Sequence, residues 1–128
     1  MIGTDVTKHI TYNMEHKFHD SLKIKMDEFV HLVYKATKDF PKDELYGVTS
    51  QLRRSALSVI LNYVEGYARA KDKVYKNFLE ISYGSLKEAK YLIHFSLVEG
   101  YLTDGNYKQI ILLTEEIGKM LWSIIQKI

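Results

Sequence analysis

The chain has 128 residues, no cysteine and a formal net charge of +2 at pH 7. This length suits one domain with its own hydrophobic core, and the lack of cysteine excludes disulfides and thiol chemistry. The net charge is too small to indicate a nucleic-acid partner by itself, so such a partner must be inferred from local clusters. The sequence contains no apolar run long enough to span a membrane and no secretory signal at its start. We therefore expect a cytoplasmic protein without a membrane partner.

Residues 1–20 lack sustained hydrophobic periodicity, and we expect them to form a flexible arm that a neighbouring subunit could order. A bundle domain should then occupy residues 21–128, with its first helix over 21–38. The inner stripe of this helix contains Leu22, Met26, Phe29, Val33 and Ala36. The histidines of the arm have irregular spacing, and the pair Glu28-x-x-His31 lacks the second motif that a di-iron bundle requires. We therefore expect no metal and no cofactor.

The stretch from Phe40 to Gly66 predicts the helix around which the domain is built, ending near Ala68. Pro41 suits a first helical turn, and the acidic residues after it suit the positive end of the helix dipole. Apolar or small residues follow at helical spacing on two adjacent rows that together cover more than half of the circumference. The rows are Leu45, Val48, Leu52, Ala56, Val59, Tyr63 and Tyr67, and Leu57, Ile60, Leu61, Val64 and Ala68. This width fits either the central helix of one bundle or a helix shared between the core and a subunit interface.

The remaining arc of this helix is polar, with short uncharged side chains at its centre, Ser58 and Asn62. Such residues are poor helix formers, so they indicate a packed, hydrogen-bonded seam, although they would also fit the lining of a mouth or channel. A short turn makes the next helix antiparallel, so that the numbers of facing residues sum to about 140. This register places Ser58 near Ser82 and predicts an ion pair between Arg54 and Glu88.

A third helix is expected from a cap at Asp72 to about Glu99, and a fourth from a cap at Thr103 or Asp104 to the end. Gly100 should end the third helix in a left-handed conformation. The inner face of the third helix is predicted as Val74, Phe78, Ile81, Ser85, Ala89, Leu92 and Ser96. The stripe of the fourth is predicted as Ile110, Ile117, Leu121, Ile124 and Ile128, with Leu113, Met120 and Trp122 elsewhere. Four helices with short connections predict an all-α, antiparallel up-and-down four-helix bundle, and the excess apolar surface favours oligomerisation.

Particular residues in these helices resemble a known family, the four-helix bundle proteins encoded in intervening sequences of bacterial 23S ribosomal RNA genes. The resemblance covers roughly residues 26–128 and departs from the family pattern at Tyr63-Val64. It rests on Phe40-Pro41-Lys42, Glu44, Gln51-Leu52-Arg53-Arg54, Ser58, Asn62, Glu65-Gly66, Gly84-Ser85-Leu86 and Glu88. The resemblance implies a homopentameric ring of bundles without established enzymatic activity, and a role in binding RNA or other nucleic acid.

One basic cluster would serve such a role, because cations with interleaved aromatic rings bind phosphates and stack on unpaired bases. The expected nucleic-acid-binding residues are Arg53, Arg69, Lys71, Lys73, Tyr75 and Lys76. An ordinary solvated hairpin tip explains any single one of these residues equally well.

Two other functions compete with nucleic-acid binding. The wide apolar faces also fit a scaffold or adaptor for another protein. An enzyme is the weakest interpretation, because no histidine lies in helical register with Ser58 or Ser85. The sequence also lacks a glycine-rich phosphate loop. We therefore expect no catalytic residues.

Overall fold

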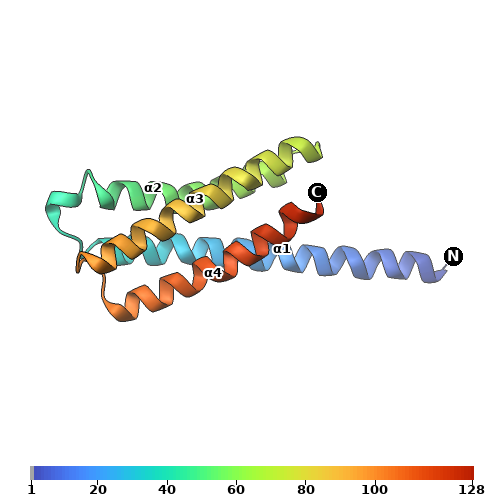
Figure 1. Cartoon of the computed structure of the whole chain (residues 1–128). Helices are drawn as coiled ribbons and strands as arrows, with labels where there is room; N and C mark the ends of the chain where they lie inside the picture. Colours follow the sequence, from blue (N-terminus) through green and yellow to red (C-terminus); the bar gives the residue numbers. More distant parts are fainter. Residues whose placement is uncertain (1) are drawn as a thin grey trace.

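The computed structural model describes the backbone of residues 2–128 and the side chains of residues 14–128. Its elements are α1 (Ile2–Thr37), the short 3-10 helix η1 (Lys42–Glu44), α2 (Val48–Tyr67), α3 (Asp72–Val98) and α4 (Asp104–Lys127). Helices that follow one another in the chain run in opposite directions (Figure 1). The all-α antiparallel up-and-down four-helix bundle predicted from the sequence is confirmed. None of the described helices is both long enough and apolar enough to cross a membrane.

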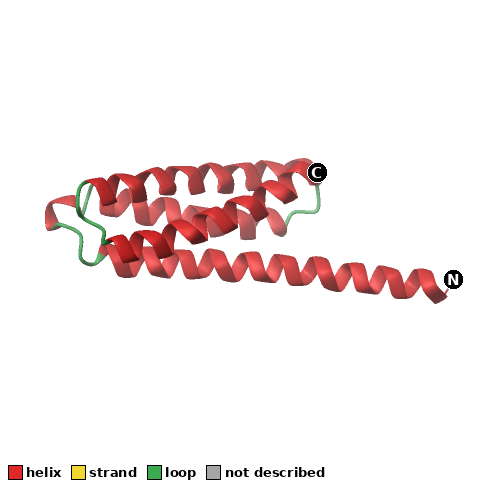
Figure 2. Ribbon diagram, turned by 60° about the horizontal axis from the view of Figure 1, so that its bottom comes forward, coloured by secondary structure: helices red, strands yellow, loops and turns green. Residues whose placement is uncertain are grey.

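The first helix is much longer than predicted. It begins at Ile2, so the expected start near Ser21 is wrong. Its N-terminal part projects past the ends of the other helices (Figure 2). A helix without neighbours needs no apolar stripe, which explains the missing periodicity. The division into a flexible arm of residues 1–20 and a bundle of 21–128 stays a prediction, but the backbone of that arm is helical from Ile2 onward.

The arm and the bundle meet at His19, whose ring lies among the tyrosines of α2. Its Nδ1 atom shares a hydrogen bond with the hydroxyl of Tyr63, and its centroid lies 4.6 Å from that of Tyr67. Burial lowers the pKa of His19 and raises that of Tyr63. Both side chains are therefore neutral at pH 7, and the hydrogen bond joins a neutral phenol to a neutral imidazole.

The core contains the predicted stripe of α1 in full but only the middle of the first predicted row of α2, because Val48 is half-buried and Tyr67 is exposed. The buried members of these two rows are Leu22, Met26, Phe29, Val33, Ala36, Leu52, Ala56, Val59 and Tyr63. The predicted helix start at Pro41 is wrong, because Pro41 precedes only η1 and α2 begins at Val48. Gly47, with non-helical φ and ψ of −111° and −116°, separates the two. Leu45 consequently lies in the connection and is exposed.

The predicted inner faces of α3 and α4 are partly wrong in phase. On α3, Val74 and Ile81 are exposed. Ser82 is buried instead, because its small side chain fits against α2 and its hydroxyl donates to the Val59 carbonyl oxygen at 2.6 Å. On α4, Leu113 is buried and Ile128 is exposed.

Of the three residues predicted to cap or end α3 and α4, two are confirmed. Gly100 has a φ of +77° after the end of α3, a conformation that side chains with a Cβ rarely adopt. Thr103 caps α4, and its hydroxyl accepts from the backbone N–H of Asn106 at 3.1 Å. The cap position of α3 is Lys71, and Asp72 is the first helical residue, so the prediction of an Asp72 cap is wrong.

The seam between α2 and α3 is packed and hydrogen-bonded, as predicted. The hydroxyls of Ser58 and Ser85 lie 2.7 Å apart, and the Asn62 amide donates to the Ser58 hydroxyl at 2.9 Å. The predicted Arg54–Glu88 ion pair is wrong. Both side chains are exposed, and none of the ion pairs between described side chains joins them. They lie on the outer edge of the seam, where water solvates each charge.

Candidate nucleic-acid interface

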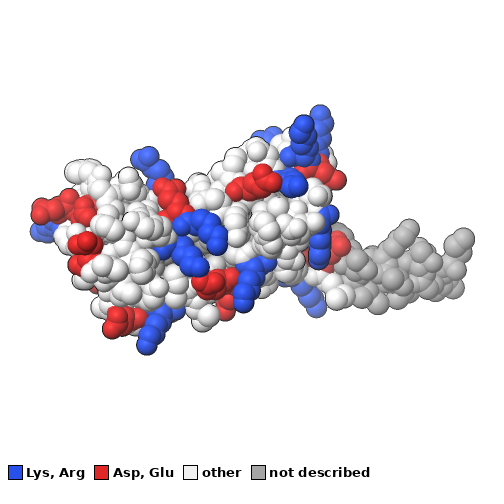
Figure 3. Space-filling view, in the orientation of Figure 1, with Lys and Arg blue, Asp and Glu red and all other residues white. Residues whose placement is uncertain are grey.

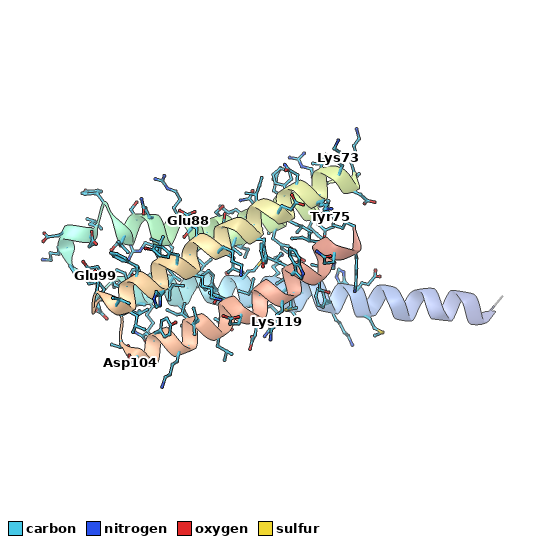
Figure 4. The ribbon with its side chains drawn as sticks, in the orientation of Figure 1. Lys73, Tyr75, Glu88, Glu99, Asp104 and Lys119 are labelled. Atoms are coloured by element: carbon cyan, nitrogen blue, oxygen red, sulfur yellow. The ribbon has the colours of Figure 1, made fainter. Side chains whose placement is uncertain are left out.

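The short connection between α2 and α3 brings four cations to one end of the molecule. We call Arg69, Lys71, Lys73 and Lys76 the hairpin-tip cluster. The first three are exposed and Lys76 is half-buried. Lys73 marks this end of α3 in Figure 4, and Lys and Arg side chains gather at the same end in Figure 3. The structure thus places four of the five predicted cations together.

The hairpin-tip cluster is only partly neutralised by its neighbours. Arg69 forms an ion pair with Glu65 and lies 5.5 Å from the centroid of the Phe78 ring. Among the described side chains, no ion pair involves Lys71, Lys73 or Lys76. Three lysines are therefore available to phosphates, and the exposed Arg69–Glu65 pair is weak enough to rearrange around a ligand.

Two tyrosines near the tip, Tyr67 and Tyr75, differ in how far they are exposed. The centroids of their rings lie 6.4 Å apart. Burial, with the neighbouring Tyr67 phenol, raises the pKa of Tyr75 to about 12, so Tyr75 stays neutral. The Tyr75 side chain is half-buried and lines a hollow of about 390 Å³ with the C-terminal end of α4. Tyr67, which is exposed, is the better stacking surface at the tip.

Arg53 does not belong to this cluster. It lies 16 residues before Arg69, which separates their backbones by about 24 Å along the helical part of the chain. Its Nε atom donates to the Thr37 hydroxyl at 2.8 Å, and its guanidinium lies 4.8 Å from the Tyr34 ring centroid. Arg53 therefore joins α2 to α1 at the opposite end of the molecule.

Other titratable side chains that the structure describes form surface ion pairs. Among the described residues, no group of three or more histidine, aspartate or glutamate side chains is placed to hold a metal ion. His31 lies 3.3 Å from Asp27 instead, and both are exposed. The pKa of the Glu115 carboxyl is lowered, because this group accepts a hydrogen bond from Lys90 and lies near the charges of Lys87 and Lys119. This arrangement is typical of a surface ion pair.

The sequence analysis missed a second set of cations and rings beside the tip. Lys76 also borders the groove between α3 and α4, which contains Tyr83, Lys87 and Trp122. The sequence did contain a sign of this set, because Tyr83 and Lys87 are four residues apart on α3, a spacing that brings side chains into contact. The error in the phase of α3 hid it, because the inner face was placed one residue away around Tyr83, although its later members Ala89, Leu92 and Ser96 are buried as predicted.

The fold and these surfaces define a class of protein, a small all-α bundle with clusters of cations at one hairpin and along one groove. The sequence pattern of the 23S rRNA-intervening sequence protein family matches residues 22–123. The chain belongs to this family, for which no function is established. The predicted resemblance is thus confirmed.

A solved structure supports the same assignment. A protein of unknown function from the S23 ribosomal protein family of Bacteroides thetaiotaomicron VPI-5482 has a TM-score of 0.73 and 26% sequence identity. The alignment covers 81% of this chain and 97% of that one. No curated protein matches the chain.

Proposed function

We propose that the protein is a non-enzymatic, oligomeric four-helix bundle of the cytoplasm that binds RNA or another nucleic acid. The hairpin-tip cluster, repeated around a homopentameric ring, forms the binding surface. The observation that supports this proposal is the exposure of Lys71 and Lys73, with Lys76 beside them, at the end of the α2–α3 hairpin. One tip would bind weakly, but several linked tips bind together with a much higher avidity.

Self-association would occur through apolar side chains that the bundle leaves uncovered on α2 and α3. The Ser58–Ser85 contact fixes a register in which Leu61 lies across from Ile81. These two side chains are 61% and 44% exposed. Leu57 is half-buried and Val64 is exposed on the same side of α2. We call Leu57, Leu61, Val64 and Ile81 the α2/α3 face. Contiguous exposed apolar surface of this kind marks interaction sites, and a cyclic ring forms when such a face meets a different patch on the next subunit.

Native mass spectrometry tests the assembly. The wild-type protein should be a pentamer, and the double variant Leu61→Glu/Ile81→Glu should be a monomer with unchanged helical circular dichroism. Leu112→Glu is the matched control, because Leu112 is also exposed but lies on α4. A monomeric wild type, or a double variant that still assembles, would contradict the ring.

Fluorescence anisotropy tests the binding, with structured RNA, single-stranded RNA and duplex DNA at several salt concentrations. The triple variant Lys71→Glu/Lys73→Glu/Lys76→Glu should lose binding and keep its oligomeric state. A triple reversal of Lys23, Lys35 and Lys108, which are exposed elsewhere, changes the net charge equally and should bind better than the tip variant. Equal affinities would show that total charge alone matters.

A protein-binding scaffold is the alternative that these experiments separate. In that case the wild type would bind none of the three nucleic acids even at low salt. A pull-down with the wild-type protein as bait would recover a partner protein without RNA, and that partner would bind through the α2/α3 face.

A further inference from the structure

We propose that the groove between α3 and α4 holds a single strand of nucleic acid, with one unpaired base stacked on Trp122. We call this the α3/α4 groove and define it by Lys76, Tyr83, Lys87, Lys90, Lys119 and Trp122. The proposal rests on the proposed nucleic-acid function, and it extends the binding surface from Lys76, which the groove shares with the hairpin tip, along α3 to Trp122.

The groove follows a row of three neighbouring hollows that share lining residues, and the first of them lies on α3 alone, beside the tip. The first, about 490 Å³, lies along residues 73–80 of α3. The second, about 300 Å³, shares Lys76 and Glu80 with the first and reaches Trp122. The third, about 170 Å³, shares Tyr83 and Trp122 with the second and extends to Lys90. From Lys73 to Lys90 the α3 backbone rises about 26 Å, so the row is an elongated track suited to an extended chain.

Aromatic rings lie in the middle of this track. The centroids of Tyr83 and Trp122 are 5.5 Å apart with their planes inclined by 39°. Trp122 is 51% exposed although it contacts Tyr83, so much of its ring surface remains open to solvent. The Lys87 ammonium lies 5.1 Å from the Tyr83 ring centroid. A base stacked on Trp122 would thus have a cation close to its own phosphate.

Lysines border both sides of the aromatic pair. Lys87 comes from α3 and Lys119 from α4, where Figure 4 labels it, and both line the third hollow. Both are exposed, and no ion pair between described side chains involves them. Lys90 is paired with Glu115 at 2.6 Å. With Lys73 and Lys76, the three hollows contain five lysines against the two carboxylates of Glu80 and Glu115.

This combination favours single-stranded nucleic acid over other occupants. The excess of lysines complements a phosphate backbone, and sequence-independent binding to single strands uses aromatic side chains on which bases stack. A duplex keeps its bases stacked on one another and could not place one on Trp122. The Gly118 position on α4 leaves room at the floor of the third hollow, because a Cβ there would meet only the Leu86 side chain, at 3.5 Å.

The test uses the full-length protein and a fluorescent oligouridylate of about ten nucleotides, a length within the usual range of single-strand sites. Trp122→Leu removes the stacking ring and should weaken binding at least about fivefold. Lys87→Gln/Lys119→Gln should reduce the slope of log K against log salt by about 1.4, since each phosphate contact on a single strand contributes about 0.7. Lys23→Gln/Lys35→Gln is the matched control on α1 and should change neither quantity. Circular dichroism and native mass spectrometry verify that each variant folds and assembles.

The outcomes separate the groove from the tip. Weaker binding of the oligouridylate by the groove variants, with duplex DNA binding unchanged, supports the proposal. If the groove variants bind like the wild type while the tip variant loses binding, the groove proposal is wrong and the proposed function stands. If the wild type binds no single strand at any salt concentration, the groove proposal is wrong together with the role in single-strand binding. If Trp122→Leu breaks the oligomer, the ring instead buries Trp122 between subunits and the groove proposal is wrong.

Discussion

Helix α3 forms two seams of opposite character. Toward α2 the contact is close, because small side chains occupy it and pair through hydroxyls, as Ser82 does with the Val59 carbonyl oxygen. Toward α4 the contact opens into hollows between large side chains such as Tyr83 and Trp122. The size of the side chains thus separates the two contacts. We call the tightly packed contact between α2 and α3 the closed seam and the hollowed contact between α3 and α4 the open seam.

The largest effect is expected from Gly66→Ala in the closed seam. A Cβ at Gly66 would lie 2.7 Å from the Phe78 Cβ and 3.4 Å from the Tyr75 carbonyl oxygen. Relieving these contacts requires the two helices to separate, which typically costs about 1–3 kcal/mol and exceeds the gain of up to about 1 kcal/mol in helix propensity. Urea denaturation should therefore give a lower free energy of unfolding. An unchanged or higher value would mean that the seam is looser than the structure has it.

A smaller loss is expected from Ser82→Ala. The Ser82 hydroxyl is fully buried, and its removal loses a hydrogen bond between α3 and α2, which contributes about 0.5–1.5 kcal/mol. Ser85→Ala is the control in the same seam. It should cost less, because Ser85 is half-buried and Ser58 keeps the Asn62 amide as a partner. Equal free energies of unfolding for the two variants would contradict this difference.

The open seam should respond to added volume in the opposite direction. At Gly118 a Cβ would make an ordinary contact at 3.5 Å, and alanine is a better helix former than glycine by up to about 1 kcal/mol. Gly118→Ala should therefore raise the melting temperature. A fall comparable to that of Gly66→Ala would show that the α3–α4 seam is as tightly packed as the other.

The smallest effect is a pH dependence of the free energy of unfolding, caused by His19 of α1 where it contacts α2. Burial lowers the pKa of His19 below its ordinary value of 6.5, and the carboxylate of Glu15 opposes this shift only partly. The unfolded chain therefore binds the proton more readily, and the free energy of unfolding falls as the pH drops below about 6.5. His19→Gln cannot titrate, so its stability should depend less on pH between about 7 and 5. Parallel curves for the two proteins would mean that other groups cause the dependence.

Much of the fold could be predicted from the sequence, because hydrophobic spacing reports directly on burial. The stripe of α1 and the row from Leu52 to Tyr63 are buried as predicted. Gly100 and Thr103 end and begin helices as their chemistry requires. The serines that face one another were predicted within one helical turn, since antiparallel register follows from a short connection.

The prediction failed where the spacing of apolar residues does not show which helix packs nearby or how closely it approaches. The projecting part of α1 extends past the other helices of this chain (Figure 2), so the bundle requires no apolar stripe from it. The prediction placed Ile81 on the inner face of α3 and put Ser82 near Ser58 without including it in that face, because apolar character alone cannot show that α2 approaches too closely for isoleucine. The hairpin-tip cluster was predictable because its members are adjacent in the chain, whereas Tyr83 and Trp122 come together only through the packing of α4 on α3.

The open seam is tested most directly through Trp122, the one tryptophan of the sequence. Its intrinsic fluorescence should be quenched as an oligouridylate is added, because a stacked base contacts the indole ring. The quenching should reverse at high salt, as the phosphate contacts weaken. If anisotropy shows that the oligonucleotide binds while the emission of Trp122 stays unchanged, the strand lies elsewhere, and the open seam is not the binding track.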